Sequence, residues 1–207
     1  MSALPESARP APPTSGTPVH SGNPERPGTT EQSGTTEYVV LVDEAGTPIG
    51  TADKATVHTT DTPLHLAFSC HLVDDEGRVL LTRRALHKRT WPGVWTNSFC
   101  GHPGPGEDPV EAIARRAEQE LGTIVDSIEP AVPDFRYRAV DDSGVVENEI
   151  CPVFTARVRS AVNPRPDEVC AHHWARPEDV RTAVEATPFA FSPWLTAQVP
   201  QMELYAR

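Results

Sequence analysis

The chain has 207 residues, of which 38% are hydrophobic, and a formal net charge of −11 at pH 7. This acidity argues against a general nucleic-acid binder, because such proteins neutralise phosphates with Lys and Arg. No run approaches the roughly 18 apolar residues that a membrane-spanning helix needs, and the four cysteines, without a C-x-x-C pair or a secretion signal, favour a reduced, cytoplasmic protein.

Residues 1–36 are rich in Pro, Ser, Thr and Gly and contain almost no large apolar side chains. Such a segment cannot bury enough apolar surface to offset its ordering entropy, so we predict a disordered tail. A role of this tail in docking a partner is a secondary alternative. Residues 37–207 are enough for one ordinary packed core and form the predicted domain.

The first predicted strand covers residues 37–43 and leads into the turn-rich segment EAGTPIG. Two strands are expected over 65–73 and 78–84, joined by an Asp-Glu-Gly turn, and the Gly- and Pro-rich stretch 91–107 is expected to be a loop. Further strands are predicted over 144–158 and 168–175, and short helices over 176–186 and 192–198, with Pro200 ending or kinking the last. Strands on both sides of a central helix indicate a mixed α/β fold.

That central helix is the clearest element, with the sequence DPVEAIARRAEQELG from residue 108 to 122. Asp108 is a good N-cap with Glu111 at the capping-box spacing, Pro109 suits the first helical position, and Gly122 is placed to end the helix. The spacing predicts one apolar face made of Val110, Ile113, Ala114, Ala117 and Leu121.

Two carboxylates and three imidazoles are candidates for a metal site. Glu147 and Glu149 are two residues apart on a predicted strand and so project from the same face. An exposed strand face would explain them, but their apolar flanks indicate partial burial, where two carboxylates repel each other unless a cation lies between. His58, His65 and His102 taken singly are ordinary loop histidines; together with the carboxylates they would suit Mn, Fe, Co or Zn. Sequence spacing does not establish that the five converge.

The segment that begins at Gly101 has the spacing of most of the Nudix box. The positions that match are Gly101, Glu107, Arg115, Glu120 and Gly122. The general pattern has a glutamate after the arginine and two adjacent glutamates further on, whereas this chain has Arg116 and the pair Gln119–Glu120. Two metal-binding carboxylates of the hydrolases are therefore missing. A plain amphipathic helix would explain the helix but not the loop in front of it.

Six separated segments carry a narrower resemblance: LHLAFS, TRRAL, WPGVWTNSFCGHP, PDFRYRA, VENEICPVF and FSPW. Together they resemble the type I isopentenyl-diphosphate isomerases over about residues 37–197. The resemblance implies a Nudix-like α/β/α sandwich with a mixed central sheet, and one divalent metal (Mn, Mg or Zn) held by three histidines and two glutamates. On this chain those ligands are His58, His65, His102, Glu147 and Glu149.

The same resemblance implies that isopentenyl diphosphate is converted to dimethylallyl diphosphate, in isoprenoid biosynthesis. Cys100 and Glu149 correspond to the catalytic groups on opposite faces of the substrate, Tyr137 to a tyrosine beside the glutamate, and Trp194 to an indole lining the pocket. Glu120 corresponds to a ligand of a Mg²⁺ that arrives with the diphosphate. The positions expected to contact the diphosphate are Lys54, Arg84, Lys88 and Arg116.

Three alternatives stay open at this point. A Nudix hydrolase would release phosphate or nucleotide. A non-catalytic Nudix-like module would be expected to lack Cys100, Glu147 or Glu149, and all are present. An interaction protein acting through its tail would be excluded by unchanged turnover and stability after removal of residues 1–36. We further expect a monomer, and we expect the short segment after Trp194 to close the pocket less fully than a longer helix would.

Overall fold

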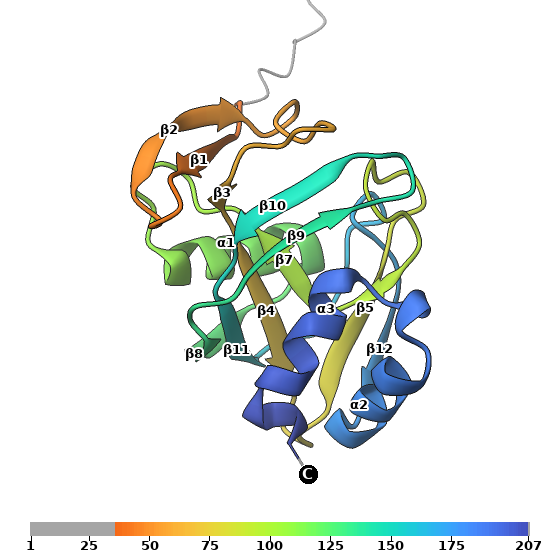
Figure 1. The fold of residues 1–207 in the computed structure, drawn as a ribbon. Coiled ribbons are helices and arrows are strands. Elements are labelled where there is room, and N and C mark those ends of the chain that lie inside the picture. The colour runs from red at the N-terminus through yellow and green to blue at the C-terminus, as the bar shows by residue number, and fades with distance from the viewer. Residues whose placement is uncertain (1–35, 207) are drawn as a thin grey trace, which may run out of the picture. The chain divides into compact units, whose positions relative to one another are not determined.

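A computed structural model describes residues 36–206, so the predicted tail over 1–36 lies, apart from Thr36, outside the described residues. The described residues form two sheets (Figure 1). The smaller sheet has, in order, β2 (Pro48–Asp53), β1 (Tyr38–Val42), β3 (His65–Leu66), β10 (Val146–Ile150) and β9 (Arg136–Val140). The larger has β12 (Val169–Ala175), β5 (Val79–Arg84), β4 (Phe68–Val73), β11 (Val153–Val158) and β8 (Val125–Val132), with β6 (Trp95–Thr96) paired to β5 and β7 (Phe99–Gly101) paired to β4.

Two of the predicted long strands cross from one sheet to the other. Ala67 separates β3 from β4, and Cys151 with Pro152 separates β10 from β11. Because Pro152 has no N–H, it cannot continue a hydrogen-bond ladder. The two crossings lie side by side, since β3 pairs in parallel with β10 and β4 with β11, and the Ala67 N–H donates to the Ile150 carbonyl at 2.9 Å.

The stretch 91–107, predicted to be a loop, contains the short strands β6 and β7. The residues Phe99, Cys100 and Gly101 pair antiparallel with Cys70, Ser69 and Phe68. Pairing with a central strand overrides the local Gly and Pro composition here. The strands β2, β8 and β9 were also absent from the sequence prediction; the others are confirmed within a few residues.

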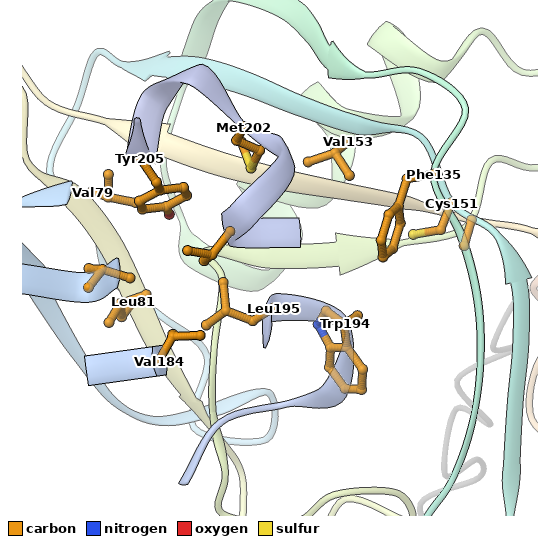
Figure 2. Packing of buried hydrophobic residues seen from close by; sticks show 13 residues of the cluster. Val79, Leu81, Phe135, Cys151, Val153, Val184, Trp194, Leu195, Met202 and Tyr205 are labelled. Carbon is orange, nitrogen blue, oxygen red and sulfur yellow. The ribbon is translucent and has the colours of Figure 1, made fainter. Parts of the chain in front are cut away.

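Helices cover both faces of the larger sheet, which confirms the predicted α/β/α sandwich (Figure 1). On β5, Leu80 packs with the helix α1 (Pro109–Leu121), while Val79 and Leu81 pack with α2 (Pro177–Ala186) and α3 (Pro193–Gln198). Figure 2 shows this second cluster, in which Leu195 lies among side chains of the sheet and the C-terminal segment. Alternation along the strand thus builds one core on each face.

The helix α1 begins and ends as predicted, but its buried face differs. The Asp108 side chain accepts a hydrogen bond from the Val110 N–H at 2.8 Å, and Gly122 has the left-handed conformation with φ of 57°. Val110 and Ala114 are exposed, contrary to the prediction. The buried residues of α1 are Ala112, Ile113, Arg116, Ala117, Glu120 and Leu121. The row Ala112–Arg116–Glu120 thus gives the helix a polar buried edge.

The chain after β12 is helical and closely packed. Ser192 caps α3 by accepting from the Leu195 N–H, and as predicted the helix ends near Pro200, in the 3₁₀ turn η2 (Val199–Gln201). The turns η1 (Pro188–Ala190) and η3 (Glu203–Tyr205) flank this region, and Tyr205 is only 1% exposed. No helix of the described part is long and apolar enough to cross a membrane.

Candidate active site

A cavity of about 280 Å³ is lined by residues of both sheets, α1 and α3. Twelve of the predicted site residues line it: Lys54, His58, Arg84, Lys88, Cys100, His102, Arg116, Glu120, Tyr137, Glu147, Glu149 and Trp194. The remaining one, His65, is fully buried. Of residues 36–206, none after Trp194 lines this cavity. The residues after Trp194, which were expected to close the pocket less fully than a longer helix would, pack against the larger sheet.

Four of the five predicted metal ligands converge. One ligand atom from each of His58, His65, His102 and Glu149 lies within 4.8 Å of all the others. Glu147 lies beside this group, with its Oε2 2.9 Å from His58 Nε2. Both carboxylates are buried, so an exposed strand face does not account for them.

Strand register explains how these residues meet. His65 on β3 is directly opposite Glu149 on β10, and Tyr137 on β9 is opposite Glu149 on its other side. Three neighbouring strands therefore place an imidazole, a carboxylate and a phenol in one row. Glu147, two residues earlier on β10, accepts a hydrogen bond from the Thr90 hydroxyl at 2.9 Å.

The imidazoles fit a divalent metal. Among residues 36–206, His58 Nε2, His65 Nε2 and His102 Nδ1 are buried without a hydrogen bond of acceptable geometry, which is rare for buried polar atoms. His65 Nδ1 is 2.9 Å from the Pro63 carbonyl, which can only accept, so the ring proton lies there and the Nε2 lone pair is left for a ligand. Nitrogen donors beside carboxylates suit Mn or Zn.

Glu149 and the neighbouring imidazoles change each other's pKa. Burial alone would lower the pKa of His65, but the charge of Glu149, whose Oε1 lies 3.5 Å from His65 Nε2, raises it. Burial alone would raise the pKa of Glu149, but His102 and His65 hold it well below its ordinary value. The ionised form of Glu149 is thus stabilised by its two imidazole neighbours, His102 and His65.

The Nudix-box residues Glu107 and Arg115 hold the segment that carries His102. They form a bidentate ion pair, with Arg115 Nε 2.7 Å and Nη2 2.8 Å from the two carboxylate oxygens. Glu107 also accepts from the Gly104 N–H at 2.7 Å. A Cβ at Gly101 would lie 2.8 Å from the Phe68 ring, so only glycine allows this close packing of the segment.

Cys100 lies between two polar residues that the sequence analysis did not identify. Its Sγ is 3.2 Å from Ser69 Oγ and 3.4 Å from Asn97 Oδ1. The same Asn97 oxygen accepts from Trp194 Nε1 at 2.9 Å, so one amide orients both the thiol and the indole. Burial raises the pKa of the Cys100 thiol to about 12, which keeps it neutral. In the sequence, the only signal for this contact of Asn97 is its position three residues before Cys100, in the segment TNSFC.

Aromatic rings enclose the end of the cavity next to Cys100. The Trp194 ring centroid is 5.5 Å from that of Trp91 and 5.8 Å from that of Tyr137. Burial raises the pKa of Tyr137 well above its ordinary value, and the charge of Glu149 adds to this, so the phenol is neutral. The Arg84 guanidinium carbon lies 5.4 Å from the Trp194 centroid and links this end to the charged one.

The opposite end holds charged side chains in pairs. Arg116 forms an ion pair with Glu120, and its Nη2 is 3.7 Å from Glu168 Oε1. Lys88 forms an ion pair with Glu168, which lines the cavity and was absent from the predicted site. The carboxylate oxygens of Glu120 and Glu168 thus lie next to the cationic side chains of Lys88 and Arg116. Because Mg²⁺ prefers oxygen ligands, this combination suits a diphosphate that carries Mg²⁺ better than it suits a bare anion.

Known proteins that resemble this chain agree on its family. The NUDIX domain family model matches residues 63–195. The chain is 66% identical over 162 residues to the isopentenyl-diphosphate Delta-isomerase of Clavibacter sepedonicus, covering 78% of this chain and 85% of that protein. It is 64% identical over 166 residues to the protein of the same name from Leifsonia xyli subsp. xyli, covering 79% and 90%.

Among solved structures, DR0079 from Deinococcus radiodurans superposes with a TM-score of 0.63 at 19% identity, covering 81% of this chain and 99% of that one. The MutT protein from Methanosarcina mazei Go1 gives a TM-score of 0.52 at 20% identity, covering 67% and 91%. At these identities the likeness supports the fold alone.

Proposed function

We infer that the chain, which belongs to the NUDIX family and within it to the isopentenyl-diphosphate Delta-isomerases, converts isopentenyl diphosphate to dimethylallyl diphosphate. This is a step of isoprenoid biosynthesis. The observation that supports it best is one cavity that combines the thiol of Cys100, the buried carboxylate of Glu149 and the indole of Trp194 with a cluster of cations.

The reaction adds a proton to the terminal alkene carbon and removes another two carbons away, so that protons balance. An unactivated alkene is a weak base, so protonation approaches a tertiary carbocation, which water would capture. Cys100 and Glu149 are proposed to carry the two proton transfers on opposite faces of the substrate. Both side chains line the same cavity, which supports this, because the two groups must reach one substrate molecule to exchange protons with it.

Trp194 and Tyr137 are proposed to surround the reacting carbons. A cation over a desolvated indole face gains roughly 2 kcal/mol, about a factor of 30 in rate if the gain occurs only in the transition state. The cross-strand position of Tyr137 opposite Glu149 would let its hydroxyl orient the carboxylate.

A divalent metal would be held by the three imidazoles with Glu149 and Glu147. Mn, Mg and Zn are candidates, and the nitrogen donors favour Mn or Zn. When bound, it would supply positive charge that fixes the Glu149 carboxylate and weakens its basicity. The chain's own contribution is the strand register that aims Glu149 into the cavity.

At the other end, the diphosphate is proposed to contact cations of the cavity wall, with Glu120 helping to hold a Mg²⁺ that arrives with the substrate. Arg116 stands where the hydrolase box has a glutamate, and its planar guanidinium can grip two phosphate oxygens. This weakens the hydrolase alternative. The proposed diphosphate contacts are Lys54, Arg84, Lys88 and Arg116.

We also propose that the enzyme acts as a cytoplasmic monomer on this small substrate, with neither nucleic acid nor membrane as a partner. Four free cysteines suit a reducing compartment. The net charge of −11 disfavours binding to polyanions.

The test is incubation of the metal-loaded protein with isopentenyl diphosphate in deuterated water, followed by proton NMR. The expected result is dimethylallyl diphosphate with deuterium in the new methyl group. Release of phosphate or monophosphate without isomerisation would instead establish the hydrolase alternative.

A further inference from the structure

The central strand β4 is buried on both faces, and one face is polar. Phe68, Cys70 and Leu72 pack toward α1, whereas Ser69 and His71 alternate with them and point to the opposite face. Ser69 and His71 are both fully buried. Burying such groups in a sheet is costly unless each has a hydrogen-bond partner, so their partners are informative.

Those partners form one chain that runs from the C-terminal segment to Cys100. The Tyr205 hydroxyl is 2.8 Å from His71 Nδ1, and His71 Nε2 is 3.0 Å from Gln198 Oε1. Gln198 Nε2 donates to Ser69 Oγ at 2.8 Å, and Ser69 Oγ is 3.2 Å from Cys100 Sγ. Every member except Cys100 is fully or almost fully buried.

The chemistry of the groups fixes the direction of this chain. Gln198 Oε1 can only accept, so the His71 proton lies on Nε2, and Nδ1 accepts from Tyr205. Burial lowers the pKa of His71 to about 4, which gives the neutral ring that this pattern needs. Since Ser69 Oγ already accepts from Gln198, its own hydrogen is available to a sulfur.

Two sulfurs compete for that hydrogen, and geometry favours Cys100. Ser69 Oγ is 3.2 Å from Cys100 Sγ and 3.5 Å from Cys151 Sγ. Ser69 and Cys100 are also directly opposite each other in the antiparallel pair β4–β7, which holds their side chains together. On the far side, the Cys100 thiol donates to Asn97 Oδ1 at 3.4 Å.

We propose that Ser69, aimed by Gln198, is a positioning residue that donates its hydroxyl hydrogen to Cys100 Sγ. This rests on the proposed catalytic role of Cys100. When the S–H bond breaks and a C–H bond forms, the electron pair of the S–H bond stays on sulfur. The Ser69 hydroxyl already points at that sulfur, so it stabilises the negative charge without rearrangement and holds the sulfur in place until a proton returns.

The first test compares Ser69→Ala with Ser98→Ala. Ser98 is an equally buried serine whose hydroxyl donates to the Leu80 carbonyl and accepts from the Leu72 N–H, both at 2.7 Å. Both variants lose a buried hydroxyl of the same size, so both should lower Tm. Ser69→Ala should lower kcat by about 10- to 100-fold with KM within about twofold, whereas Ser98→Ala should keep kcat within about threefold.

The second test asks whether Gln198 acts through Ser69. Gln198→Met keeps the length of the side chain but removes the N–H that orients the serine hydroxyl. It should lower kcat in the wild-type background by about 3- to 10-fold and have no further effect on kcat in the Ser69→Ala background. Independent, multiplying effects of the two substitutions would overturn the coupling.

Cys100→Ala in the same assay distinguishes a failure of the positioning role of Ser69 from a failure of the catalytic role of Cys100. If Cys100→Ala is inactive while Ser69→Ala turns over like Ser98→Ala, the positioning role is wrong and the catalytic thiol stands. If Cys100→Ala retains wild-type turnover, both the catalytic assignment and the role of Ser69 fall together.

Discussion

The two ends of the cavity are built in opposite ways. At the end proposed to hold the hydrocarbon, Cys100 and Trp194 are neutral, and both are held by Asn97, which is fully buried between β6 and β7. At the end proposed to hold the diphosphate, Lys88 and Arg116 are long charged side chains whose partners are carboxylates. The function of the first end depends on side chains held in fixed positions. The function of the second depends on cations that can exchange a carboxylate partner for a phosphate group. Substitutions at the first should therefore change kcat, and at the second KM.

The largest effects are expected from the two proposed proton-transfer groups. Cys100→Ala and Glu149→Gln should each lower kcat by about 10³-fold or more, because each removes a general acid or base. Neither change should prevent folding, which circular dichroism and Tm would check. Activity within a few-fold of wild type in either variant would contradict the role assigned to that residue.

Loss of a metal ligand should come next. His58→Ala should lower both the metal content, measured by mass spectrometry of the dialysed protein, and kcat by about 100-fold, since one of the donors is lost. His172→Ala is a matched control, because His172 is exposed on β12. Stoichiometric metal in His58→Ala would show that this imidazole is no ligand.

The aromatic wall should have an intermediate effect that still falls on kcat. Trp194→Leu should lower kcat by about 30-fold if the indole stabilises positive charge mainly in the transition state. Trp194→Phe keeps an aromatic face but loses the bond to Asn97, so a smaller loss is expected. A rise in KM with unchanged kcat would mean that the ring only binds the substrate.

Much of the fold was predictable from local chemistry, and much of the site was not. The caps Asp108 and Gly122 are local signals and gave the bounds of α1. The burial of Arg116 and Glu120 was missed because the pattern of apolar residues ignores charged ones that face a cavity. That His65 meets Glu149 depends on the parallel pairing of β3 with β10, which sequence spacing does not reveal.

The supporting residues of the site were the hardest to predict. Ser69 and Gln198 are 129 residues apart, and Asn97 and Trp194 are 97 apart. Ser69, Asn97 and Gln198 are ordinary small or polar residues, and although Ser69 and Asn97 lie within segments that carry the family resemblance, nothing in those segments reveals their partners. Such contacts arise only when α3 packs against β4 and against the segment between β6 and β7, which no local pattern in the sequence reveals.

At the charged end, Lys88→Met should raise KM by about tenfold while kcat stays within about threefold. The effect should shrink as ionic strength rises, because attraction between the lysine and the diphosphate is screened. Arg138→Met, an exposed cation on β9 that does not line the cavity, is the control. A salt-independent fall in kcat would place Lys88 with the fixed, hydrocarbon end instead.

The smallest effect is expected at the rim, where Lys54 Nζ is 2.6 Å from Glu37 Oε2. The two side chains are 27% and 48% exposed, and pairs so exposed contribute only about 0–1 kcal/mol. Glu37→Gln removes the carboxylate that competes with the diphosphate for Lys54, so KM should fall by up to about fivefold and kcat should not change. Steady-state kinetics at low and high salt would check this. A rise in KM would mean that Glu37 holds Lys54 in its binding position, so that even this exposed cation relies on a fixed partner.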